Sequence, residues 1–237
     1  MTALSKQTVV IVGASSGIGL AAARAAASQG AETIMVSRSR APLEEAAKAV
    51  GGRARALPMD MMDRAEVDRT FASIGPFDHL VLTAAGEELA YRGKITDLTN
   101  EDVERAFDKF RGFVNVTRAA APLLRGSLTL TSGTSAVRPP AGFSILAAVS
   151  ASVVSFGKAL ALELAPVRVN VLMPGIVNTP RHGDRREEIR AWAESPTGLP
   201  ARHFGQPEDI AQAIVFLMTN PYMAGHTLII DGGGVVT

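Results

Sequence analysis

The chain opens with an apolar run and a glycine-rich turn, VVIVGASSGIG, and this opening constrains the fold more than any other stretch. The β-branched run TVVIVG predicts a buried strand, and the Ala-rich segment from about Ile18 to Gln29 predicts a helix. Gly13, Gly17 and Gly19 stand between the two, where glycine permits a tight turn and a close approach of the backbone to a ligand. A purely structural turn would use the same residues. A strand, a glycine turn and a helix at the start of an alternating chain favour a pyrophosphate at the helix N-terminus.

The rest of the chain repeats this alternation of short apolar runs and helical segments. Further strands are predicted at ETIMVS, ARALPMD, HLVLTAAG, SLTLTSG, VRVNVLMPG and HTLIIDGGG. Helices are predicted at PLEEAAKAV, RAEVDRTFASI and PEDIAQAIVFLMT, at about 146–164, and as one long helix over 100–124 with Asn100 as its N-cap. Strands this apolar suit a parallel sheet covered on both faces. We therefore expect an α/β fold, a doubly wound parallel, Rossmann-like sheet, in a single domain over 1–237. A charged, irregular segment at about 180–205 is expected to act as a substrate lid.

Composition narrows the class of function. The chain has 237 residues, a formal net charge of +1 and no cysteine. The charge gives no reason to expect nucleic acid or an acidic membrane as a partner, and the lack of cysteine fits a reducing cytoplasm. The N-terminus has no signal-peptide layout, no apolar run reaches the length of a bilayer span, and no His/Asp/Glu spacing resembles a metal site. We expect a cytoplasmic protein that binds no membrane and no metal.

The second predicted strand ends in VSRSR, where an NAD site usually carries an acidic residue for the ribose 2′-hydroxyl. Ser37 offers only a neutral hydroxyl here, and Arg38 follows it. A guanidinium forms paired, charge-assisted bonds with a phosphate, so the pattern favours NADP(H). The alternative for Arg38 is a solvated loop arginine, and Arg40 is a weaker second candidate.

These motifs resemble those of the short-chain dehydrogenase/reductase family, and the resemblance runs along nearly the whole chain. VGASSGIG is similar to the family's G-x-x-x-G-x-G turn, LPMDMMD to its adenine-contacting segment, TAAG to its NNAG turn and RVNVLMPGIVNTP to its nicotinamide segment. TLIIDGGG resembles a C-terminal signature that helps subunits pair, so the resemblance implies a homodimer or homotetramer. It also implies the following cofactor contacts: Gly13, Ser15, Ser16, Gly17, Ile18, Gly19, Ser37, Arg38, Asp60, Met61, Ala85, Gly86, Pro174, Gly175, Val177 and Thr179.

The resemblance breaks at the catalytic residues, which makes the chain an atypical member. The family's Tyr-x-x-x-Lys pair falls on Leu146 and Ser150, and its asparagine in the preceding long helix falls on Lys109. The family's serine falls on Gly133 by its usual separation, and on Ser132 if a loop differs by one residue. Leucine has no proton to give. An efficient reductase therefore needs another acid, since a general acid contributes about 10²–10⁴-fold.

Several side chains are candidates for that acid. Lys109 is the first choice, with a helix-surface lysine as its alternative reading. Tyr91 and His182 follow, with a packing aromatic and a surface-loop histidine as the alternatives. Ser132 is expected to hold the substrate oxygen, with Thr134 and Ser135 nearby. The arginines of the lid suit an anionic substrate, although acidic residues among them also fit a solvated lid helix.

The first hypothesis is an NADP(H)-dependent oxidoreductase that reduces a small-molecule carbonyl or imine at a non-standard site. An NADP(H)-binding sensor and a non-catalytic subunit that pairs with an active one are the alternatives. Fold alone does not decide among them.

Overall fold

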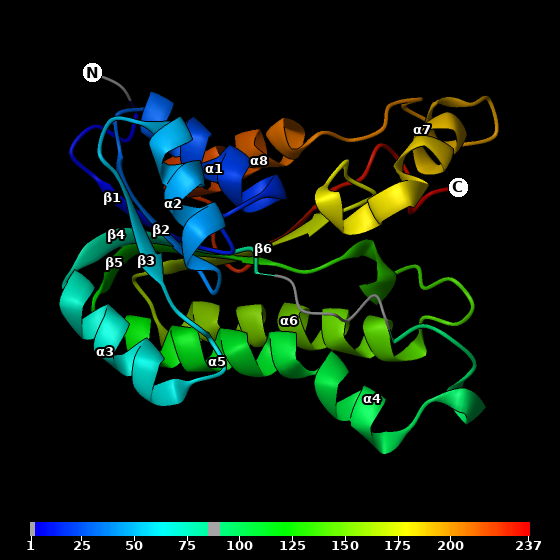
Figure 1. The fold of residues 1–237 in the computed structure, drawn as a ribbon, viewed down its shortest axis with the longest axis horizontal. Coiled ribbons are helices and arrows are strands. Elements are labelled where there is room, and N and C mark those ends of the chain that lie inside the picture. Colours follow the sequence, from blue (N-terminus) through cyan, green and yellow to red (C-terminus); the bar gives the residue numbers. More distant parts are fainter. Residues whose placement is uncertain (1–2, 85–90) are drawn as a thin grey trace.

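Seven parallel strands form one sheet in the order β3-β2-β1-β4-β5-β6-β7, as the computed structural model shows for residues 3–84 and 91–237 (Figure 1). Every neighbouring pair of strands is parallel. The strands are β1 (Thr8–Val12), β2 (Glu32–Ser37), β3 (Ala54–Pro58), β4 (Phe77–Leu82), β5 (Leu124–Thr131), β6 (Arg168–Pro174) and β7 (Thr227–Ile230). The predicted doubly wound parallel sheet is confirmed.

Helices cover both faces of the sheet. One layer holds α1 (Gly17–Ser28), α2 (Arg40–Val50) and α8 (Pro207–Thr219), and the other holds α3 (Arg64–Ile74), α5 (Asp108–Ala120) and α6 (Ser144–Glu163). Successive side chains of a strand point to opposite faces, so Val9 and Ile11 join the core under the first layer, and Val10 and Val12 join the core under the second. This two-sided burial explains why the strands are apolar runs without alternation.

The strand order reverses its direction between β1 and β4. The chain moves outward from β1 to β3 and then returns to place β4 on the other side of β1. The loops at the carboxyl ends of β1 and β4 therefore diverge, and an α/β sheet opens a crevice for ligands at such a point.

The predicted single helix over 100–124 is wrong in three respects. The segment forms α4 (Asn100–Ala106) and α5, with a break at Phe107, and Leu124 already belongs to β5. The N-cap is Thr99 rather than Asn100, because the Thr99 hydroxyl and the Asp102 carboxylate form a reciprocal capping box. Arg111 bridges the break by donating to the Glu104 carbonyl at 3.0 Å.

The expectation that no uninterrupted apolar run spans a membrane holds for α6, which Ser150, Ser152 and Ser155 interrupt, although its average composition is apolar. Among the described residues, α6 is the one helix whose length and composition would allow it to cross a bilayer. In the structure it covers the sheet beside β6, and 33% of its apolar stretch is buried. Helices that cover an α/β sheet pass the same test of length and composition.

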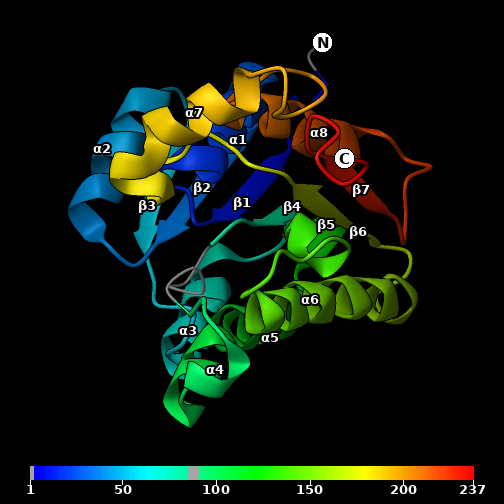
Figure 2. The same cartoon turned by 90° about the vertical axis from the view of Figure 1, so that its right-hand side faces the viewer.

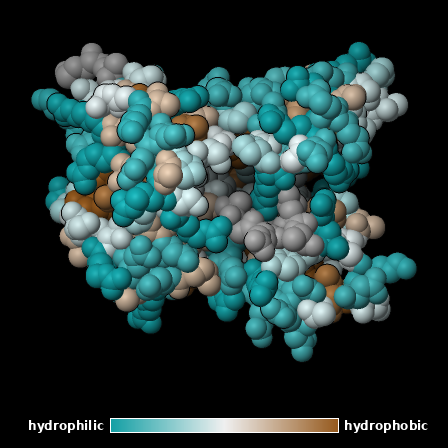
Figure 3. Space-filling model, in the orientation of Figure 1, coloured by the Kyte–Doolittle hydropathy of each residue, from teal (hydrophilic) through white to brown (hydrophobic). Residues whose placement is uncertain are grey.

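The charged segment after β6 contains a turn, η3 (Pro180–Arg185), and a short helix, α7 (Arg186–Glu194). Further short turns are η1 (Ile95–Asp97) and η2 (Thr134–Ala136). Seen toward the carboxyl edge of the strands, α7 lies on one side and α4 on the other (Figure 2). The face seen in Figure 3 is largely hydrophilic, with scattered apolar residues.

Candidate active site

A single open cleft of about 1570 Å³ runs along the carboxyl ends of the strands. Its wall includes Lys109, Ser132, Leu146 and Ser150, so the predicted catalytic positions lie beside the predicted cofactor positions. Ala85 and Gly86 lie outside the described residues. The other predicted cofactor residues all line the cleft: Gly13, Ser15, Ser16, Gly17, Ile18, Gly19, Ser37, Arg38, Asp60, Met61, Pro174, Gly175, Val177 and Thr179.

The glycine turn after β1 is packed so closely that side chains are excluded. Gly13 has φ +96°, and a Cβ on it would lie 2.5 Å from the Ala84 nitrogen. A Cβ on Gly19 would lie 2.2 Å from the Gly13 carbonyl oxygen. The first turn of α1 contains no acidic residue, and Ser16 makes no side-chain cap with it. This helix end therefore suits an anion such as a pyrophosphate.

The carboxyl end of β2 presents Ser37 and Arg38 next to this turn. The Ser37 hydroxyl lies 3.1 Å from the Ser15 hydroxyl, which joins the two loops. Arg38 is exposed, and no ion pair engages it within the described part of the chain. Arg40, in contrast, pairs with Glu44 at 3.3 Å. Arg38 is thus the better placed of the two arginines to meet a 2′-phosphate at the cleft.

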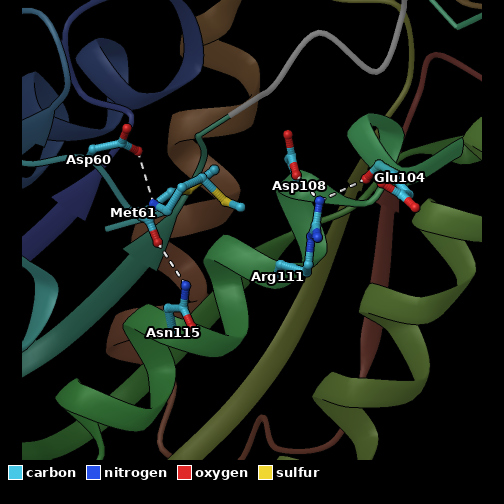
Figure 4. A network of polar contacts seen from close by, with 7 residues as sticks. Asp60, Met61, Glu104, Asp108, Arg111 and Asn115 are labelled. Atoms are coloured by element: carbon cyan, nitrogen blue, oxygen red, sulfur yellow. Dashed lines mark hydrogen bonds and ion pairs between the residues drawn. The ribbon is translucent and has the colours of Figure 1, made fainter. Parts of the chain in front are cut away.

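The segment after β3 is held in place by a network of hydrogen bonds (Figure 4). The Asp60 carboxylate accepts from the Met62 amide at 2.9 Å, and the Asp60 amide donates to the Glu66 carboxylate at 3.1 Å. Asn115 of α5 donates to the Met61 carbonyl at 3.1 Å. The sequence did not lead us to predict Asn115 as a functional residue. Its amide side chain stands between Val114 and Val116 in a helix that covers a sheet, and this position indicates a polar contact.

The segment after β6 brings the other end of the cleft close to the glycine turn. A Cβ on Gly17 would lie 3.1 Å from the Thr179 side chain. A Cβ on Gly175 would lie 2.6 Å from that of Asp231, whose carboxylate accepts from the Gly233 and Val235 amides at 3.0 and 2.7 Å. The predicted nicotinamide segment therefore stands against both the first turn and the C-terminal tail.

The first turns of α6 present Leu146 and Ser150 to the cleft, one helical turn apart. The Ser150 hydroxyl lies 2.9 Å from the Ser135 hydroxyl. Ser132 donates its hydroxyl proton to the Ser150 backbone carbonyl at 2.7 Å, which directs that proton toward α6. A Cβ on Gly133 would lie 3.5 Å from the Ser150 hydroxyl, in ordinary contact, so the backbone at Gly133 faces the Ser135–Ser150 pair.

Lys109 is buried rather than on the helix surface, with only 8% of the residue exposed. It stands in the first turn of α5 and lines the cleft. Its ammonium nitrogen lies 5.6 Å from the ring centroid of Phe113, within the range of a cation–π contact. The structure therefore brings a buried amine into the cleft that Leu146 and Ser150 line.

The other two candidate acids differ in their surroundings. Tyr91 lines the cleft and packs in a small apolar cluster with Ala106 and Val149. The His182 Nε2 lies 2.9 Å from the Val177 carbonyl, which can only accept, so this nitrogen carries the proton and is engaged. Burial lowers the pKa of His182, and the neighbouring arginines lower it further, so the neutral form dominates at pH 7. His182 is consequently a poor proton donor.

The predicted lid segment is anchored to the predicted nicotinamide segment. The Arg186 guanidinium donates twice to the Asn178 side-chain oxygen, at 2.7 and 3.0 Å. Ile189 and Trp192 of α7 line the cleft. Within the described residues no group of His, Asp and Glu side chains has the arrangement of a metal site.

A doubly wound parallel sheet with a close-packed glycine turn and an open cleft at its switch point defines a dinucleotide-binding α/β protein. A family model described as enoyl-(acyl carrier protein) reductase matches residues 13–234. The chain belongs to the short-chain dehydrogenase/reductase family, a family of oxidoreductases.

Individual relatives span the whole chain. A short-chain dehydrogenase/reductase of an Acremonium species is 31% identical over 98% of this chain and 97% of its own length. The 3-oxoacyl-[acyl-carrier-protein] reductase of Bos taurus is 33% identical, over 94% and 95%. A solved short-chain dehydrogenase/reductase superposes with a TM-score of 0.88 at 31% identity, covering 99% of each chain. A small-chain dehydrogenase solved in complex with NADPH gives 0.84 at 32% identity, covering 98% of this chain and all of its own.

Proposed function

We propose that the protein is an NADP(H)-dependent oxidoreductase that reduces a carbonyl or imine group at a non-standard catalytic site. The observation that carries this proposal is the single cleft, in which the cofactor-type turn, Arg38 and the buried Lys109 meet. The proposal includes the atypical pair: Leu146 and Ser150 stand where relatives of this type carry tyrosine and lysine.

The residues at the cofactor end fit a dinucleotide phosphate. The close-packed glycine turn and the uncapped start of α1 suit the pyrophosphate, and Arg38 suits a 2′-phosphate. One structural relative was solved with NADPH, and a 3-ketoacyl-(acyl-carrier-protein) reductase from Brucella melitensis, 28% identical, was solved with NADH. Ser37 and Arg38 favour the phosphorylated form for this chain. When bound, NADPH supplies the hydride that the substrate carbon accepts.

The oxygen or nitrogen of the reduced group must gain a proton, so that the carbonyl becomes an alcohol or the imine an amine. Leu146 cannot supply it. Lys109 has three donor hydrogens on a buried ammonium, and it would donate the proton or stabilise the developing negative charge. The Ser135–Ser150 pair would hold the substrate oxygen, because only one of its two protons is needed for the bond within the pair. Ser132 would join it only by turning its hydroxyl away from the Ser150 carbonyl.

The alternative function is an NADP(H)-binding sensor or a non-catalytic subunit. The apolar Leu146 favours it, because this side chain places a hydrocarbon where reduction needs a proton donor. The proposal also assigns a role to two other parts of the chain. Residues 180–205 form a lid over the substrate. The uncovered side of α6, where Leu162 is 83% exposed, pairs with a second copy of the chain in a cytoplasmic homo-oligomer.

The test is NADPH oxidation against a panel of aldehydes, ketones and imines by the wild-type protein and by Lys109→Met. We expect the variant to keep NADPH affinity and to lose about 10²-fold or more in turnover, the lower range for a general acid. Lys48→Met is the control, because Lys48 is an exposed lysine of α2 that does not line the cleft. Full turnover by Lys109→Met would remove Lys109 from the mechanism and point to Tyr91. NADPH binding with no turnover across the panel would favour the sensor.

A further inference from the structure

The α5 helix holds the predicted adenine-contacting segment by two residues on one of its faces (Figure 4). Asn115 donates a hydrogen bond from its side chain to the Met61 carbonyl at 3.1 Å, across 54 positions of sequence. One turn earlier, a Cβ on Gly112 would lie only 2.6 Å from the Cγ and Sδ atoms of Met61. The backbone and the side chain of Met61 are thus both placed by α5.

Other bonds hold the beginning and the shape of this segment. The Met59 amide donates to the Ser37 carbonyl at 3.0 Å, which ties the start of the segment to the end of β2. Met62 donates to the Asp60 carboxylate at 2.9 Å, and Asp60 donates to the Glu66 carboxylate at 3.1 Å. The Asn115 bond acts further along, because it ties Met61 to a helix that packs under the sheet.

We propose that Asn115 is a positioning residue for the adenine ring of the cofactor, and this inference rests on the proposed NADP(H) function. Without the Asn115 amide, the partly buried Met61 carbonyl loses its hydrogen-bond partner. The turn then gains freedom, and the Asp60 carboxylate, which lines the cleft, no longer presents its oxygen at a fixed place to the amino group of adenine.

The experiment uses Asn115→Asp and two probes that each contain one half of the cofactor. Aspartate has the shape of asparagine but only accepts hydrogen bonds, so it repels the Met61 carbonyl. The affinity for 2′,5′-ADP, which contains the adenine, is expected to fall about five- to 150-fold, the range for an unsatisfied buried acceptor. The affinity for reduced nicotinamide mononucleotide, which lacks adenine, is expected to stay unchanged.

Asn170→Asp is the matched control. Asn170 in β6 also donates its side-chain amide to a methionine carbonyl, that of Met223, at 2.8 Å. Neither Asn170 nor Met223 lines the cleft. This variant is expected to lose thermal stability and to keep its affinity for 2′,5′-ADP.

A folded Asn115→Asp protein that binds 2′,5′-ADP like the wild type would overturn the inference, and so would an equal loss for both probes. Asn115→Ala provides a second variant for the case that Asn115→Asp does not fold, because alanine favours the helix and removes the amide donor without placing a charge beside the Met61 carbonyl. Its affinity for 2′,5′-ADP is also expected to fall, and an unchanged value would overturn the inference. A wild-type protein that binds neither probe would instead overturn the proposed cofactor function.

Discussion

The cofactor end and the catalytic end of the cleft depend on the sequence in different ways. The cofactor end is made of backbone: Gly13 and Gly19 are required because other backbone atoms lie within 3 Å of where a Cβ would be. The catalytic end is made of side-chain chemistry on α5 and α6, with Lys109, Leu146 and Ser150 facing a common space. An exchange at the first end would distort the fold locally, whereas an exchange at the second changes reactivity and leaves the packing intact. Under the proposed function, the chain keeps the family's cofactor end and differs from the family at the catalytic end.

Rebuilding the family pair gives the largest expected effect. In the Lys109→Met protein, Leu146→Tyr combined with Ser150→Lys should raise NADPH-dependent ketone reduction by about 10²–10⁴-fold, because a proton donor returns to a site that has lost its own. The measurement is the turnover rate with a panel of ketones. The control adds Leu146→Phe and Ser150→Met to the same Lys109→Met protein, which matches the added volume without a proton donor. A rebuilt protein that binds NADPH but reduces ketones no faster than this control would show that more than the donor has changed.

The cofactor end should fail when a single methyl group is added at Gly19. Gly19→Ala places a Cβ 2.2 Å from the Gly13 oxygen, so the turn must move. Overpacking of this kind costs about 1–3 kcal/mol, and NADPH affinity should fall by up to about 100-fold. The same change at the catalytic end, Gly133→Ala, meets nothing closer than 3.5 Å and should leave NADPH affinity unchanged. The measurement is the NADPH affinity of both variants by titration. Equal affinities would contradict the expectation that only the cofactor end is intolerant of an added methyl group.

The choice between the two nicotinamide cofactors should depend on one arginine. Arg38→Ala is expected to weaken NADPH binding by about 1.5–3 kcal/mol, the value for a hydrogen bond to a charged group, and to leave NADH binding unchanged. Arg40→Ala is the control, since Arg40 pairs with Glu44. Parallel titrations with both nucleotides test the expectation. A wild-type protein that binds NADH as tightly as NADPH would contradict it.

The smallest expected effect lies away from both ends of the cleft, at His79 in β4. His79 is buried between the Gln7 side chain and the Ser127 hydroxyl, each at 2.8 Å, and burial lowers its pKa to about 4. In the unfolded chain the imidazole has a pKa of about 6.5, so the unfolded state binds more protons between these values. The stability due to neutral His79 is therefore complete above pH 6.5 and is lost as the pH falls toward 4, by about 2 kcal/mol at pH 5.

Urea unfolding at a series of pH values measures this loss. His79→Asn should flatten the dependence between pH 6.5 and 4, and the same change at the exposed His226 should keep it. A wild-type slope in His79→Asn would assign the acid sensitivity to other groups.

The cofactor residues stay a prediction, although those that the structure describes line one cleft. The sequence predicted the sheet and the direction of its strands, because these follow from apolar periodicity. It failed where local choices depend on tertiary contacts. At the break at Phe107 the Arg111 side chain donates to the Glu104 carbonyl, and the helical pattern of 100–124 does not predict that contact. The hydrogen bond from Ser132 to the Ser150 carbonyl likewise depends on how α6 meets β5, so the sequence indicated a hydroxyl at this place but not its direction.

The helices α5 and α6 contribute different residues to the cleft, and this difference has a consequence for redesign. Lys109 and Asn115 are separated by about 9 Å of rise along α5. Under the two proposals, this one helix therefore serves both the reacting group and the adenine segment. Altering its sheet-facing side to accept a new substrate would disturb both at once. The helix α6 carries Leu146 and Ser150 and none of the predicted cofactor contacts. A library confined to the first two turns of α6 and to Gly133 can therefore explore new chemistry on a cofactor platform that stays unchanged.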